Sequence, residues 1–195
     1  MRVNRPNGDE SMATDRLALV RDKVDQILRQ IAEWEYQRAG TIHLYGVSAV
    51  CVLLAVRRGL DPELCAVAGM LHDIRTYRTG DYQDHAQLGA PEAEKILEEL
   101  GCFTPEEIAL VGCAIARHSD KEACDEAVDE LLKDADVLQH FLFNPGIVDG
   151  LFGPGGEVPA EAAAWVGRWR SVLNELGVEP NGRWPAQASV DPTGG

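Results

Sequence analysis

The sequence is poor in several features that mark whole classes of protein. Its longest apolar runs, near residues 47–56 and 65–71, are interrupted by charge or glycine, so we expect none to span a membrane. The first 15 residues contain no apolar segment of the kind found in signal peptides. We therefore expect a cytoplasmic protein that does not bind a membrane.

Cysteine is scarce and unclustered. The chain has five cysteines, and no two of them form a C-x-x-C pair: Cys51, Cys65, Cys102, Cys113 and Cys124. An odd number without clustering argues against a disulfide framework and against a zinc site built from thiolates. Most of them have apolar neighbours, where a free cysteine behaves as a small hydrophobic residue.

Positive charge is also in short supply. The chain has 18 Lys and Arg against 32 Asp and Glu, which gives a formal net charge of −14. Such a surface would repel a nucleic-acid backbone, so we do not expect a nucleic-acid polymer as partner. A small phosphorylated ligand is still compatible with this charge, because a few cations in a cleft can override the global field.

No strand pattern, hairpin signal or internal repeat is found, and between the two ends of the chain the pattern is helical. With 195 residues, 45% of them hydrophobic, the chain is long enough for one domain with a core. We predict an all-α fold of about seven helices over residues 15–177. Residues 1–14 are expected to be disordered, and residues 178–195 to form an irregular tail.

Several helix boundaries can be predicted from the sequence. We expect Gly40 to end the first helix and a second helix, carrying His43 in its first turn, to follow it. Asp61 and Pro62 open a third helix, whose apolar body "LCAVAGML" predicts a central, buried position. A capping box at residues 104–107 opens a later helix. A polar loop is expected at residues 76–84 and a long loop at residues 144–158.

Polar side chains recur on the inner faces of these helices. They are His43, His72, Asp73, His118 and Asp136, and His85 is added from the loop. Each one alone is more often a packed, capping or exposed residue than a ligand. Together they form the imidazole and carboxylate set that binds divalent metals, and helical bundles commonly build such sites from facing helices.

The order of these residues resembles the HD-domain superfamily of metal-dependent phosphohydrolases. The resemblance rests on "GMLHDI", "DHAQLGAPEAEKIL", "AIARHSDK" and "KDADVLQHF", and it covers roughly residues 35–145. It implies an orthogonal bundle of helices around one or two divalent ions, with Mn, Fe, Zn, Co, Ni and Mg all open. A single HD-type domain over residues 15–177 follows from it.

The resemblance also implies the ligands. His43, His72, Asp73 and Asp136 match the four core positions. His85 and His118 match the extra histidines of members with a second metal, where Asp73 would bridge; members with one metal use such groups for substrate or water. Helical periodicity does not choose between Asp134 and Asp136, but the family pattern matches Asp136. His140 falls outside the pattern, and we interpret it as structural or as support behind the ligands.

The implied activity is hydrolysis of a nucleotide or another small phosphate ester by a metal-activated water, with Asp73 orienting that water or accepting its proton. Arg75, Arg78 and Lys121 are the candidates to bind the anionic substrate, although solvated surface charge is an equal alternative for each. Two other functions stay open: a di-iron oxygenase or lyase, and a non-catalytic metal-stabilised module that binds a nucleotide or a partner. A homodimer also stays open.

Overall fold

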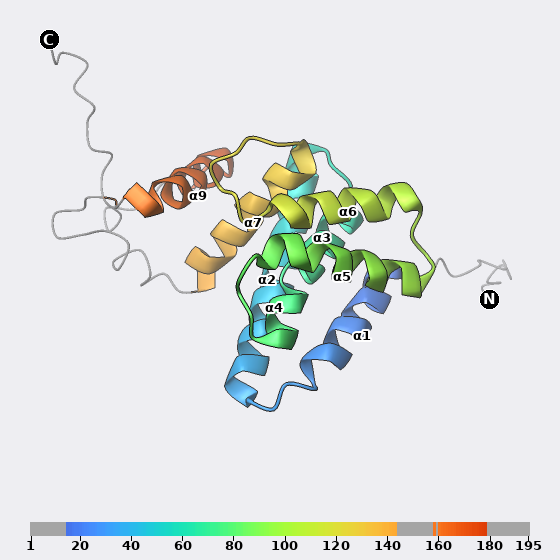
Figure 1. Cartoon of the computed structure of the whole chain (residues 1–195). Coiled ribbons are helices and arrows are strands. Elements are labelled where there is room, and N and C mark those ends of the chain that lie inside the picture. Colours follow the sequence, from blue (N-terminus) through green and yellow to red (C-terminus); the bar gives the residue numbers. More distant parts are fainter. Residues whose placement is uncertain (1–14, 144–157, 159, 179–195) are drawn as a thin grey trace, which may run out of the picture.

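The computed structural model describes residues 15–143, 158 and 160–178. These residues form helices and no strand, which confirms the predicted all-α fold (Figure 1). The helices are α1 (Arg16–Leu28), α2 (Trp34–Arg58), α3 (Pro62–Leu71), α4 (Ile74–Thr79), α5 (His85–Leu100), α6 (Pro105–Arg117), α7 (Ala127–Phe143), the 3-10 helix η1 (Ala160–Ala162) and α9 (Ala163–Glu175).

The helix α3 lies at the centre of the bundle, as its sequence predicts. Every residue from Leu64 to Leu71 is buried. The Asp61 carboxylate accepts hydrogen bonds from the backbone N–H groups of Glu63 and Leu64, which would otherwise lack a partner in the first turn. The chain therefore reaches His72, at the end of α3, in the interior of the protein.

Close contact between α2 and α3 depends on Gly69. A Cβ atom on Gly69 would lie 2.8 Å from the Cα of Ser48, so only glycine lets the two backbones approach this closely. The Ser48 hydroxyl donates to the carbonyl of Ala66 at 2.9 Å across the same interface. This contact brings His43 on α2 next to His72.

The prediction that Gly40 ends the first helix is wrong. Helix α1 ends at Leu28 and α2 begins at Trp34, so Gly40 lies inside α2. A Cβ atom on Gly40 would lie 2.8 Å from the ring of Tyr77, so the glycine makes room for that ring rather than stopping the helix. His43 is consequently well inside α2 and not in its first turn.

The predicted loop at residues 76–84 is partly helical. Helix α4 extends to Thr79 and ends at Gly80, whose φ of 72° is readily adopted by glycine. The capping box at residues 104–107 is confirmed at the start of α6. The segment 1–14, most of the loop 144–158 and the tail beyond residue 178 lie outside the described residues.

Helix α2 is long enough, and its most apolar window has a high enough mean hydropathy, 1.9, to pass a test for a membrane-spanning helix by length and composition alone. Half of its most apolar window is buried inside the protein, and it packs against α3 and α7. A core helix passes the same test of length and composition, and this packing accounts for the apolar character of α2.

Candidate metal centre

The structure brings all six predicted ligand side chains to one place. His43 lies on α2, His72 and Asp73 between α3 and α4, His85 at the start of α5, His118 at the end of α6, and Asp136 on α7. His43, His72, His118 and Asp136 are buried, whereas Asp73 and His85 are partly exposed. We call these six residues the His–Asp centre.

The rings of His43 and His72 lie close to the carboxylates of both Asp73 and Asp136. The Nε2 atoms of His43 and His72 are 3.0 Å apart, and each lies 3.6 Å from Oδ2 of Asp73. Oδ1 of Asp136 lies 3.5 Å from Nε2 of His43 and 3.8 Å from Nε2 of His72. Ligand atoms at about 2.1 Å from one ion in a tetrahedron lie about 3.4 Å apart. Each carboxylate therefore has about the spacing from the two imidazoles that is expected of ligands sharing one ion, and the ligand atoms of His43, His72 and Asp73 all lie within 4.8 Å of one another.

The other oxygen of Asp73 faces a second group. Its Oδ1 lies 3.5 Å from Nε2 of His118 and 3.7 Å from Nε2 of His85. This oxygen is buried and has no hydrogen-bond partner among the described residues. A buried carboxylate oxygen without a partner is costly, and a cation would satisfy it. Asp73 thus lies between two donor groups, the arrangement that two ions would require.

The histidine rings are held in one orientation from behind. Each Nδ1 atom lies near an oxygen acceptor: His43 near Oε1 of Gln139 (2.8 Å), His72 near the carbonyl of Gly69 (2.9 Å), His85 near that of Tyr82 (3.1 Å) and His118 near that of Ile115 (2.7 Å). A carbonyl oxygen only accepts, so Nδ1 carries the proton and a neutral ring presents its Nε2 lone pair to the centre. Such contacts commonly orient metal-binding histidines.

With the rings in these orientations, hydrogen-bond acceptors on the imidazoles face one another and the carboxylate oxygens. The Nε2 lone pairs of His43 and His72 point at each other and at ionised carboxylates, and such atoms repel unless a positive charge lies among them. A divalent cation satisfies all of them at once, and without it a proton must take that role. The residues of the centre therefore fit a bound metal ion.

The pKa shifts at the centre keep its carboxylates ionised, which favours binding of a cation. Burial by itself would raise the pKa of Asp136, but the Lys121 ammonium and the neighbouring imidazoles hold it well below its ordinary value. Burial opposes ionisation of Asp73 in the same way, and His72, His118 and His43 outweigh it, so its pKa is also well below the ordinary value. Burial lowers the pKa of His118, which favours the neutral ring that a metal needs.

The pKa of His72 is shifted in the opposite direction from that of His118. Burial lowers its pKa, but the nearby carboxylates of Asp73 and Asp136 outweigh this and raise it above the ordinary value. A proton therefore competes with a metal ion for this ring.

The structure separates Asp134 from Asp136. Oδ2 of Asp134 lies 2.7 Å from the guanidinium of Arg58, and its Oδ1 lies 3.1 Å from that of Arg168. Asp136, half a turn further along α7, faces the His–Asp centre. This placement supports Asp136 as the ligand, which stays a prediction.

The three predicted substrate-binding cations have different surroundings. Arg78 makes two 2.6 Å contacts with Glu92, and Nζ of Lys121 lies 2.7 Å from Oδ2 of Asp136. Arg75 lies 3.6 Å from Asp81, and its Nη1 is buried without a hydrogen-bond partner in the described residues. Of the three, Arg75 has the N–H group with the most obvious need of an anion. All three assignments remain predictions.

Two residues of α7, Gln139 and His140, contact residues of the centre more directly than the sequence indicated. Gln139 is buried and holds the ring of His43, and Gly46 leaves room for it, since a Cβ there would lie 2.8 Å from Cγ of Gln139. Nε2 of His140 lies 3.4 Å from Oδ1 of Asp136. Both follow Asp136 by three or four residues, the spacing that places side chains on one helix face. That spacing was the available signal.

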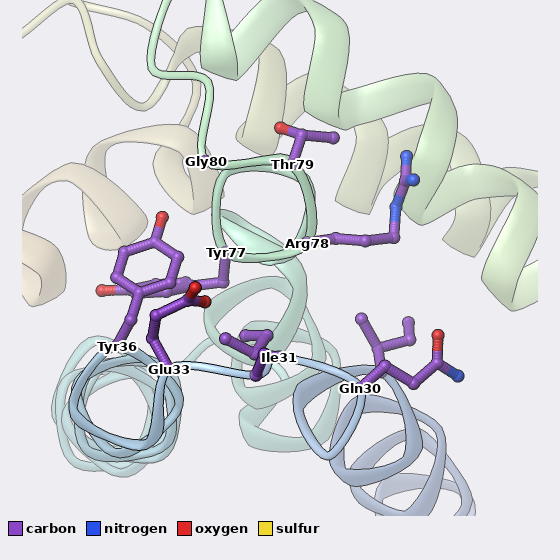
Figure 2. Close-up of a pocket in the computed structure, with 10 residues that line it drawn as sticks. Gln30, Ile31, Glu33, Tyr36, Tyr77, Arg78, Thr79 and Gly80 are labelled. Atoms are coloured by element: carbon purple, nitrogen blue, oxygen red, sulfur yellow. The ribbon is translucent and has the colours of Figure 1, made fainter.

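A pocket of about 620 Å³ opens between the α1–α2 connection and α4. Figure 2 shows Tyr36 and Tyr77 side by side on one flank of it, while the Arg78 side chain extends away from them. Tyr77 also lies close to the centre, with its ring centroid 6.1 Å from that of His43. Tyr77 is therefore shared by the pocket lining and the surroundings of His43.

Comparison with known proteins agrees with this geometry. The family model "HD domain" matches residues 40–140. "Putative phosphohydrolase YueE" of Bacillus subtilis (strain 168) is 30% identical over 131 residues, which cover 59% of this chain and 74% of that protein. A crystal structure of a predicted HD superfamily hydrolase from an uncultured Thermotogales bacterium shares the fold, with a TM-score of 0.52 and 23% identity over 83% of this chain and 87% of that one. This chain belongs to the HD domain family.

Proposed function

We propose that the chain is a metal-dependent phosphohydrolase that acts on a nucleotide or another small phosphate ester. The observation that carries the proposal is the convergence of four oriented imidazoles on the carboxylates of Asp73 and Asp136. Membership of the HD domain family and a relative named as a phosphohydrolase support hydrolysis as the reaction class. The formal charge of −14 favours a small substrate over a nucleic-acid polymer.

The residues that would hold the metal follow from the two groups. His43, His72, Oδ2 of Asp73 and Oδ1 of Asp136 would hold one ion. His85, His118 and Oδ1 of Asp73 would hold a second. When bound, a divalent ion lowers the pKa of water and withdraws charge from a phosphoryl oxygen.

The protein's own contribution is orientation and charge. Asp73 lies between the two groups, so we assign to it the orientation of the attacking water. The acceptors behind the rings keep each Nε2 atom aimed inward. Arg75, whose Nη1 has no hydrogen-bond partner among the described residues, is our first candidate to bind a substrate phosphate, because a guanidinium donates two parallel hydrogen bonds to phosphate oxygens.

The direct test is a screen of nucleoside mono-, di- and triphosphates with Mn, Fe, Zn, Co, Ni and Mg. We expect phosphate release with at least one pair, and its loss in Asp136→Asn. Asp134→Asn is the matched control, because this carboxylate lies two residues away on the same helix but binds Arg58 and Arg168. It should retain turnover.

Two outcomes would contradict the proposal. Iron-dependent oxygen consumption or bond cleavage without phosphate release would indicate an oxygenase or lyase. Tight nucleotide binding without turnover under any ion would indicate a non-catalytic binding module.

A further inference from the structure

Helix α9 lies outside the residues that the family model matches, yet it contacts two residues beside the His–Asp centre. It packs along α7, as Figure 1 shows. Its Trp165 ring lies 5.0 Å from Nζ of Lys121, a cation–π contact, and 5.4 Å from the ring of His140. One aromatic side chain of α9 therefore touches two polar groups beside the centre.

Both of these groups contact Asp136. Nζ of Lys121 donates to Oδ2 of Asp136 at 2.7 Å, and Nε2 of His140 lies 3.4 Å from Oδ1. Because Lys121 occupies Oδ2, Asp136 presents Oδ1 to His43 and His72. The position of Lys121 thus fixes which oxygen of Asp136 faces the metal-binding group.

Lys121 itself depends on α9. It lies between α6 and α7, in a segment without regular helix, and its side chain is only 4% exposed. Its ammonium also donates to the carbonyl of His118 at 2.7 Å. Nε of Arg168 donates to the carbonyl of Lys121 at 2.8 Å, and Nη2 of Arg168 donates to that of Ala123 at 3.1 Å. Helix α9 therefore holds both the side chain and the main chain of Lys121.

We propose that Trp165 is a positioning residue that acts through Lys121 to set the carboxylate of Asp136, so that α9 is part of the metal-binding site. The inference rests on the proposed function, since it assumes that Asp136 binds the ion. It also gives Lys121 a task other than substrate binding. Groups that support a metal ligand from behind typically change metal affinity by 10- to 100-fold.

The test is titration of the metal-free full chain with Co²⁺, followed by the visible absorbance of the ion, which reports affinity and ligand geometry together. We expect Trp165→Ala to weaken Co²⁺ binding about tenfold, and Lys121→Met to weaken it at least as much. Trp165→Phe keeps an aromatic face and should lose only about threefold, since phenylalanine binds a cation less strongly than tryptophan.

The double variant Trp165→Ala with Lys121→Met separates positioning from general packing. If Trp165 acts through Lys121, the double variant binds Co²⁺ no more weakly than Lys121→Met alone. Gly167→Ala is the matched control on α9, because a Cβ there meets nothing within 4 Å, and its affinity should equal that of the wild type.

Three results are informative in different ways. Wild-type affinity and spectrum in Trp165→Ala, or additive losses in the double variant, would overturn the inference and leave the proposed function intact. Absence of Co²⁺ binding by the wild type would instead overturn the proposed function, and the inference with it. If thermal melting shows that Trp165→Ala is unfolded, Trp165→Phe is used in its place. Wild-type affinity in Trp165→Phe, or a loss that adds to the loss in Lys121→Met, would then overturn the inference.

Discussion

Helix α7 contributes to two clusters of charged and polar groups, both at least partly buried, that are built differently. One is the His–Asp centre. The other, which we call the ion-pair network, consists of Arg58, Asp125, Glu130, Lys133, Asp134, Arg168 and Glu175. In the network, carboxylates meet ammonium and guanidinium groups at 2.6 to 3.1 Å. At the centre, carboxylates meet imidazole nitrogens that carry lone pairs.

Only the ion-pair network has its charges balanced without a bound ligand. The network matches acceptors with donors, so its charges stabilise the fold without help. At the centre, the Lys121 ammonium contacts the carboxylate of Asp136. Otherwise imidazole lone pairs face carboxylate oxygens, and Oδ1 of Asp73 has no hydrogen-bond partner among the described residues.

The largest effect is expected at the centre. His72→Ala and Asp73→Ala should each abolish both metal binding and phosphate release, because each removes a side chain at the heart of the donor set. Turnover assays with purified variants of confirmed fold check this. Unchanged turnover in either variant would be incompatible with the proposed site.

In the network, the largest effect should come from Lys133, which is fully buried and contacts Asp125 at 2.6 Å and Glu130 at 2.9 Å. Lys133→Met removes the ammonium between these carboxylates and leaves Glu130 with Arg168, so it should lower the free energy of unfolding by about 3 kcal/mol. Urea unfolding measures the loss. At a temperature where the variant is folded, its metal affinity should match that of the wild type, and a parallel loss of metal would show that the two clusters are not independent.

Metal should stabilise the protein through the centre alone. At an ion concentration 100 times the dissociation constant, binding adds about 2.7 kcal/mol to the free energy of unfolding. Thermal melting with and without a chelator should show the shift in the wild type and in Lys133→Met, and no shift in Asp73→Ala. A shift of the same size in Asp73→Ala would mean that the ion binds elsewhere.

Gly46→Ala should loosen the ring of His43. The added Cβ would lie 2.8 Å from Cγ of Gln139, so Gln139 must move from the ring it holds. We expect metal affinity to fall about tenfold. Gly167→Ala again serves as the control, because the space around that glycine is open. Equal metal affinities for Gly46→Ala and Gly167→Ala would show that Gln139 does not affect metal binding through His43.

These residues show how much the sequence alone could predict. The buried helix α3, the caps at Asp61 and Thr104, and the inward placement of the six ligand candidates follow from local patterns and from the family resemblance. The roles of Gly40 and Gly46 could not be predicted, because each makes room for a side chain from another helix. The contacts of Lys121 and Arg78 likewise depend on partners distant in sequence, Trp165 and Glu92 among them.

The smallest effect concerns pH and the network. Burial raises the pKa of Glu130, but Arg168 and Lys133 outweigh it and lower the pKa from 4.5 to about 2. Its stabilising effect is fully present above pH 4.5 and is lost as the pH falls towards 2. Glu130→Gln should therefore be less stable than the wild type by about 1 kcal/mol at pH 7, because the carboxylate is partly exposed. The difference should shrink on acidification, and a difference that does not change with pH would contradict this assignment.

If the His–Asp centre binds a divalent ion, elemental analysis of the purified full chain should detect that ion. After incubation with Mn, Fe, Zn, Co or Ni and removal of unbound ion, we expect one or two ions per chain in the wild type and in Asp134→Asn, and none in His72→Ala. A wild type that retains no ion, or a His72→Ala variant that retains as much as the wild type, would contradict binding at this centre.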